Sequence, residues 1–194
     1  MDTGNFFLLH HARLDAQLRD LFGGLTDDQM RRRPHPRVAP IAWLFWHMAC
    51  CEDTLNRLLA GRAMVLDEEN WLPRLNLTGR DAGVGMTDAQ VEAVSARVDV
   101  AALRAYQAAV GRRTEELVVS LGPGELDHLP DPRQLDSLFG DDGVFTARSR
   151  EVRRIFAGKT KGWFLGHLGL THPREHLAQA ILVKKMLGLG RGRA

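Results

Sequence analysis

Apolar residues recur every three or four positions along nearly the whole chain, and this helical period limits the possible folds more than any other feature. No segment shows the strict alternation that marks a half-buried strand. The pattern predicts four main helices, with a break near 98–100 in the third, over about residues 5–22, 40–61, 87–121 and 160–188. Long connections follow the second and the third of these helices. The sequence therefore predicts an all-α four-helix bundle with long connections between helices 2 and 3 and between helices 3 and 4.

The two long connections differ in character. Residues 64–85 lose the helical period, and Pro73 together with several glycines and asparagines indicates turns. Residues 125–158 contain two prolines and a Gly-Asp-Asp-Gly turn, so we expect a long loop with one short inserted helix there. The length of 194 residues suits a single domain that spans 1–194 and includes this insertion.

Charge and cysteine usage restrict the class of partner and the compartment. The chain has 26 Lys and Arg residues against 24 Asp and Glu, and the basic residues are scattered, so we expect no nucleic-acid partner. The longest apolar stretch, residues 38–51, is interrupted by Pro40 and His47 and is too short to cross a membrane. Cys50 and Cys51 are adjacent, which does not suit a disulfide. Since the N-terminus also lacks signal-peptide features, we predict a cytoplasmic protein.

Three histidines are the strongest candidates for chemistry. His172 and His176 are four residues apart in the last predicted helix, so both imidazoles lie on one face, one turn apart. Zinc enzymes use this spacing for a helical ligand pair and take a third ligand from elsewhere. His47 lies within the most apolar predicted helix, where an unpaired imidazole is costly. It is either a core histidine bonded to a neighbouring polar group or a ligand that faces the other two.

Four further residues have weaker claims. His167 lies nine positions before His176, nearly on the opposite side of a regular helix, so we interpret it as a packing or surface residue. Cys51 is one turn beyond the histidine of the second helix and offers a thiolate, but a free cysteine is more often a small buried apolar residue. Glu52 and Glu175 are candidates to orient the imidazoles, Glu52 the better of the two.

Two sequence runs carry a resemblance to a known family. Residues 41–49, Ile-Ala-Trp-Leu-Phe-Trp-His-Met-Ala, are similar to the second-helix signature of the DinB-like superfamily. Residues 172–179, His-Pro-Arg-Glu-His-Leu-Ala-Gln, resemble its last helix, and the run 85–87, which opens a long helix, is also similar. The resemblance extends over about residues 5–190.

This resemblance to the DinB/YfiT-like metalloenzymes has several implications. It implies one divalent metal ion, zinc or nickel, held by His47, His172 and His176. Relatives include mycothiol-dependent maleylpyruvate isomerase and bacillithiol S-transferases, in which the metal is thought to activate a low-molecular-weight thiol. The resemblance therefore also implies such a thiol as a second cofactor, a small-molecule substrate and a homodimer.

Pro173 lies inside the proposed ligand pair, where a regular helix does not favour it. Proline has no N–H to bond residue 169, so it either kinks the helix or marks a restart. In the second case, Thr171 is placed to cap the new helix, with Pro173 in its first turn.

Three functions agree with these residues. Three protein ligands leave an open position on the metal, as in catalytic zinc sites, so we predict a metal-dependent thiol transferase or isomerase. No separate acid, base or nucleophile is evident, and no catalytic residue beyond the metal ligands is assigned. A metal-dependent hydrolase would use the same ligands with water in the open position. A non-enzymatic metal-binding stress-response protein is the third alternative, and a fourth protein ligand would favour it.

Overall fold

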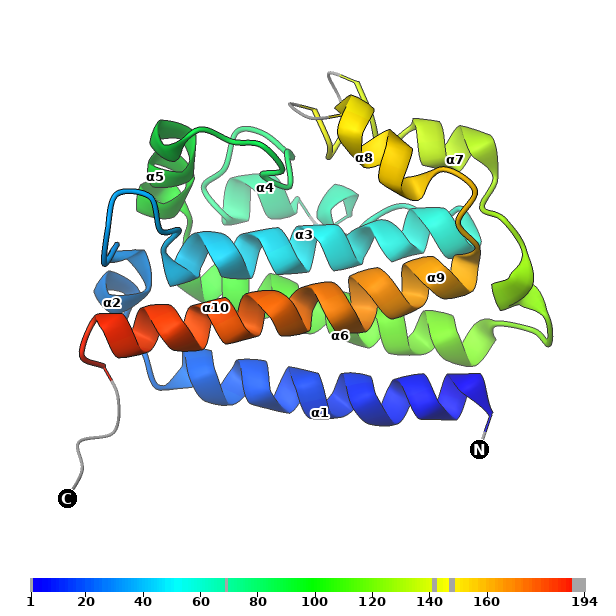
Figure 1. Cartoon of the computed structure of the whole chain (residues 1–194), viewed down its shortest axis with the longest axis horizontal. Coiled ribbons are helices and arrows are strands. Elements are labelled where there is room, and N and C mark those ends of the chain that lie inside the picture. The colour runs from blue at the N-terminus through cyan, green and yellow to red at the C-terminus, as the bar shows by residue number, and fades with distance from the viewer. Residues whose placement is uncertain (1, 69, 141–142, 147–148, 190–194) are drawn as a thin grey trace.

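The computed structural model describes residues 2–68, 70–140, 143–146 and 149–189, and it is helical (Figure 1). Its long segments are α1 (Thr3–Gly23), α3 (Ile41–Ala60), α6 (Val100–Ser120) and a last segment made of α9 (Lys161–Gly166), η3 (His167–Thr171) and α10 (His172–Met186). α3 packs against α6 and α10, and α1 packs against α6 and α10 on the other side. Within the described ranges, the one β-type pairing is an isolated bridge between Phe139 and Phe145. The all-α prediction is confirmed.

Local chemistry sets the helix boundaries close to the predicted positions. The Asp2 side chain accepts a hydrogen bond from Asn5 N and caps α1. Gly61, with φ +64°, ends α3 in the left-handed conformation that glycine adopts without strain. The predicted break near 98–100 lies between α5 (Asp88–Arg97) and α6, and Asp99 caps the N-terminus of α6.

The connections contain more short helices than the sequence predicts. Between α3 and α5 lie η1 (Val65–Asp67) and α4 (Trp71–Arg74). Residues 125–158, expected to hold one short helix, contain η2 (Glu125–Asp127), α7 (Pro132–Asp136) and α8 (Ser149–Phe156). A further short helix, α2 (Asp27–Arg31), precedes α3. Elements of three to eight residues span at most about two turns, too few to produce a recognisable helical period.

A buried carboxylate fixes the connection after α3. Asp53 is fully buried and accepts hydrogen bonds from Val65 N, Leu66 N and the Tyr106 hydroxyl, each at 2.8 Å. Burial raises the pKa of Asp53, while these hydrogen bonds act in the opposite direction. Because η1 and α6 both donate to one carboxylate of α3, the start of the long connection is held against the centre of the molecule.

The tryptophans of the two most apolar helices differ in burial. Their places in these apolar helices predict that Trp43, Trp46 and Trp163 all line the core, but of the three only Trp46 is buried there, at 1% exposure. Trp43 and Trp163 are partly buried and pack against the edge of the core. Both edge tryptophans contact histidines: Trp43 stacks on His47, and the Trp163 ring lies 4.6 Å from the His167 ring at an interplanar angle of 30°.

Replacement of Trp46 by alanine is expected to lower the free energy of unfolding by about 3–5 kcal/mol, because it leaves a large cavity between α3 and the following loop. The indole Nε1 also donates to Asp81 O at 3.2 Å, and this bond would be lost. Urea denaturation of the two proteins measures the difference. Phe6, which is 47% exposed, is the control, and Phe6→Ala should cost much less. Equal effects of the two substitutions would show that Trp46 does not support the core.

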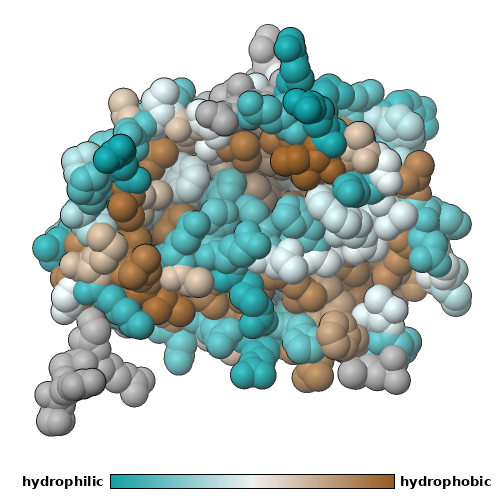
Figure 2. Space-filling view, in the orientation of Figure 1, coloured by the Kyte–Doolittle hydropathy of each residue, from teal (hydrophilic) through white to brown (hydrophobic). Residues whose placement is uncertain are grey.

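Polar and apolar residues are intermixed over the face on which α10 lies (Figure 2). On α10, Leu182 and Met186 are exposed beside Lys184 and Lys185. Over the part of the chain that the structure describes, no helix combines the length and the hydropathy needed to cross a membrane.

Candidate metal centre

Three imidazoles from two helices meet at one point. His47 projects from α3, and His172 and His176 project from α10. The Nε2 atom of His172 lies 3.1 Å from Nε2 of His47 and 3.1 Å from Nε2 of His176. The three ring centroids are 4.5–4.9 Å apart, with steep angles between the ring planes. The structure therefore brings together the three histidines that the sequence selected.

A turn formed by residues 81–83 orients His47. The Ala82 carbonyl oxygen lies 2.5 Å from His47 Nδ1, and the Ala82 N–H donates to Val144 O at 2.8 Å. Gly83 has φ +96°, and a Cβ atom there would lie 2.7 Å from the Trp43 ring. Only glycine fits this conformation and this close approach. Since Trp43 stacks on His47 at 4.9 Å, the imidazole is held between an aromatic ring and a backbone carbonyl.

A π-helical segment accommodates Pro173 and keeps the ligand pair on one face. The five residues of η3 precede α10, and the His172 N–H bonds to His167 O, five residues back. Because of this wider turn, the N–H that Pro173 lacks does not end the helix. Thr171 does not cap a new helix, because its hydroxyl bonds back to His167 O at 3.2 Å. Of the two alternatives for Pro173, the Thr171 cap does not occur, although Pro173 does lie in the first turn of α10, and His172 and His176 keep the four-residue helical spacing.

Hydrogen bonds to the outer ring nitrogens determine where the lone pairs point. His47 Nδ1 faces a carbonyl oxygen and must donate its proton to it, which leaves Nε2 as the basic nitrogen. His176 Nδ1 faces Gln179 Oε1 at 2.8 Å, and the same reasoning applies. Both Nε2 lone pairs therefore point at His172 Nε2. His172 Nδ1 is buried and has no partner among the described residues.

The environment keeps two of these imidazoles neutral. Burial lowers the pKa of His47 to about 4, against a smaller opposing effect of the Ala82 carbonyl. Burial, together with the neighbouring His47 and His176, lowers the pKa of His172 to about 2. Neutral imidazoles are the form that binds metal ions.

The donor set fits a divalent metal ion. Imidazole nitrogens bind zinc at about 2.0–2.1 Å, so three nitrogens of a tetrahedral site lie about 3.3 Å apart. The two separations from His172 Nε2, 3.1 Å to His47 and 3.1 Å to His176, are close to this value. A cation between the rings would also satisfy lone pairs that otherwise face one another. Outer acceptors such as Ala82 O and Gln179 Oε1 are typical of metal-binding histidines.

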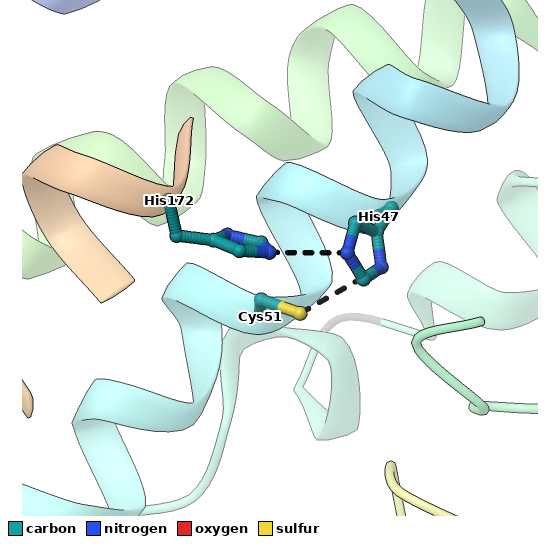
Figure 3. Close-up of side chains that lie close together, drawn as sticks. All are labelled: His47, Cys51 and His172. Carbon is teal, nitrogen blue, oxygen red and sulfur yellow. Dashed lines mark hydrogen bonds between the residues drawn. The ribbon is translucent and has the colours of Figure 1, made fainter. Parts of the chain in front are cut away.

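Cys51 lies beside this cluster. Its Sγ atom is 3.8 Å from His47 Nδ1, and one donor atom each of His47, Cys51 and His172 lie within 4.8 Å of one another (Figure 3). Cys51 and the adjacent Cys50 are buried, and burial raises the pKa of each thiol. The free thiol is therefore protonated.

The other candidates take different places. Glu52 does not orient an imidazole of the histidine triad (His47, His172 and His176). It accepts a hydrogen bond from the buried His11 Nε2 at 2.8 Å, on the α1 side of α3. Glu175 is exposed on α10. His167 lies nearer to His172 than a regular helix would place it, because the π-helical segment shifts its position. The two rings are 5.8 Å apart. Its Nδ1 contacts the Thr171 hydroxyl at 3.2 Å.

Sequence reasoning missed the two outer acceptors. Ala82 contributes a backbone carbonyl from a segment without periodicity, so its identity gave no signal. Gln179 lies three residues after His176, at the end of the run 172–179. Helical spacing of three residues places the two side chains close together, so this contact could have been predicted.

Comparisons with known proteins agree with this fold. The sequence model of the DinB superfamily matches residues 9–180. A crystal structure described as that of the conserved protein of locus from Enterococcus faecalis superimposes with a TM-score of 0.73. It is 16% identical in sequence, and the alignment covers 98% of this chain and 99% of that chain, which shows a shared fold. Among curated proteins, none is similar enough to match the chain.

Proposed function

Because the chain belongs to the DinB superfamily, we propose that it is a metal-dependent enzyme in which His47, His172 and His176 hold one divalent ion that activates a low-molecular-weight thiol. The observation that carries this proposal is the approach of the Nε2 atoms of His47 and His176 to His172 Nε2, each at 3.1 Å, between α3 and α10. Zinc or nickel suits an all-imidazole donor set.

The three histidines would hold the ion through their Nε2 atoms, and three nitrogen ligands leave a coordination position for a substrate. Its outer nitrogens are tied to Ala82 O and Gln179 Oε1, so the rings have little freedom to turn. An ion held there would lower the pKa of a bound thiol, so that the thiolate is present near neutral pH. Trp43 and Trp163, partly buried at the edge of the core, present apolar surfaces beside His47 and the neighbouring His167.

The zinc-loaded protein is expected to accelerate alkylation of a cysteinyl thiol by a fluorogenic chloroalkyl electrophile by about tenfold or more at pH 6.5. Only about 1% of a thiol with a pKa near 8.5 is ionised at that pH, which leaves room for a gain of up to about 100-fold. Fluorescence measures the rate with cysteine, glutathione, bacillithiol and mycothiol as thiols.

The control is His47→Gln, which keeps a donor for Ala82 O but removes the metal-binding nitrogen. It should leave the rate at that of the metal-depleted protein. Hydrolysis of nitrophenyl esters by the zinc-loaded protein, with no acceleration of alkylation, would instead support the metal-dependent hydrolase. Metal binding with neither activity would support the non-enzymatic alternative. The homodimer that the resemblance implies is a separate part of the proposal, and light scattering of the purified protein checks it.

A further inference from the structure

Cys51 has an unusual position for a core cysteine. It follows His47 by one turn of α3 and is 2% exposed. Its sulfur belongs, with His47 and His172, to a group of side chains whose donor atoms all lie within 4.8 Å of one another, and His176 is not part of this group. Figure 3 shows the sulfur beside the two facing rings of His47 and His172.

The two adjacent cysteines differ in their polar contacts. The Cys50 thiol donates to Arg80 O at 3.6 Å, which is an ordinary arrangement for a buried S–H group. The Cys51 sulfur faces His47 Nδ1 at 3.8 Å, but that nitrogen already donates its proton to Ala82 O. His47 Nδ1 therefore has no lone pair to accept the thiol proton. Packing alone explains Cys50, whereas the Cys51 sulfur lies beside the His47 imidazole, where its contact is with Nδ1 rather than with the Nε2 that faces His172.

The donor atoms of this group are close enough together for one ion to reach them after a small adjustment. With metal–sulfur and metal–nitrogen distances of about 2.3 and 2.1 Å, a sulfur ligand lies about 3.6 Å from each nitrogen ligand. The donor atoms of Cys51, His47 and His172 all lie within 4.8 Å of one another. A side-chain adjustment of about 1 Å is therefore enough to bring the sulfur into range.

We propose that Cys51 is a fourth protein ligand, which completes a three-nitrogen, one-sulfur donor set with His47, His172 and His176. The inference rests on the proposed histidine centre. When the sulfur binds the ion, its proton passes to solvent, since a coordinating thiol is deprotonated. A thiolate in the donor set favours zinc and other thiophilic ions over magnesium or manganese.

A fourth protein ligand has a consequence for function. Structural zinc sites have four protein ligands, whereas catalytic sites keep a position for substrate. Ligation by Cys51 would therefore mean that the ion is enclosed by the protein when no substrate is bound. A substrate thiol would have to be accommodated as a fifth ligand or in place of Cys51.

Cobalt substitution tests the inference directly, because cobalt(II) reports its ligands by absorption. Cobalt added to the metal-depleted protein should produce visible d–d bands and a strong near-ultraviolet thiolate-to-cobalt band. The near-ultraviolet band should persist in Cys50→Ser, the matched neighbour, and disappear in Cys51→Ser, while the visible bands remain. X-ray absorption of the zinc-loaded unmodified protein should independently show one sulfur at about 2.3 Å.

The possible outcomes separate this inference from the proposal on which it rests. Visible bands without the near-ultraviolet band in the unmodified protein, or a scattering shell of nitrogen and oxygen alone, would overturn Cys51 ligation and leave the histidine centre intact. The same conclusion follows if Cys51→Ser retains the full near-ultraviolet band. An absence of cobalt binding by any variant would overturn both.

Discussion

Zinc added to the metal-depleted protein is expected to raise its free energy of unfolding by about 4 kcal/mol when free zinc is a thousand times its dissociation constant. The reason is that the three Nε2 atoms converge only in the folded chain, where α3 and α10 are side by side. An unfolded chain separates His47 from His172 and His176 by more than a hundred residues and binds the ion weakly. Urea denaturation in a zinc buffer, with and without zinc, measures the difference.

Substitution of one triad member should remove most of this stabilisation. His172→Ala is the most informative variant, because its Nε2 atom contacts both other rings. His167→Ala is the matched control from the preceding helical turn, and zinc should stabilise it nearly as much as the unmodified protein. If zinc stabilised neither the unmodified protein nor the control, or stabilised His172→Ala as strongly, the three histidines would not form the site.

Acidification from pH 6.5 to pH 4 is expected to lower the stability of the metal-depleted protein by about 2.5 kcal/mol through His47 alone. Burial lowers the pKa of His47 to about 4 in the folded chain, compared with 6.5 when unfolded. The unfolded state therefore binds a proton in this pH range that the folded state does not. The stability from this depressed pKa is complete above pH 6.5 and is lost as the pH falls towards 4. His172, with a still lower pKa, acts in the same direction.

His11 does not oppose this trend within the same range. Burial disfavours its protonated form, but the hydrogen bond and charge of Glu52 outweigh burial and raise the pKa of His11. The contribution of a raised pKa is fully present below the unfolded value of 6.5 and is lost only at higher pH. Urea denaturation at several pH values tests the prediction, with His47→Gln as the control. The stability of that variant should fall less between pH 6.5 and 4, and an unchanged slope would contradict a neutral buried His47.

The sequence predicted the long helices because their apolar period extends over five or more turns. α3 is the clearest case, since its predicted range of 40–61 differs from the observed Ile41–Ala60 by one residue at each end. The break before α6 was also predictable, because Asp99 is a good N-cap residue. The short helices between residues 125 and 158 were underpredicted, because each spans only three to eight residues, too few to show a helical period of its own.

The candidate site was predictable only in part. The pairing of His172 with His176 follows from helical spacing, and the burial of His47 follows from its apolar neighbours. The position of His167 was not predictable, because periodicity assumes a regular helix and Pro173 induces a π-helical segment. The acceptor role of Ala82 depends on a backbone carbonyl and on the fold of a distant loop. Neither the shifted position of His167 nor the acceptor role of the Ala82 carbonyl depends on residue type in a way that the sequence reveals.

The metal content of the protein purified without a polyhistidine tag tests the central claim most directly. Elemental analysis should find close to one divalent ion, zinc or nickel, per chain in the unmodified protein and in His167→Ala. His47→Ala, His172→Ala and His176→Ala should each lose most of that metal, because each removes one of three convergent nitrogens. Folded, metal-free unmodified protein that takes up no zinc or nickel on dialysis would contradict the account, as would triad variants that retain the full metal content.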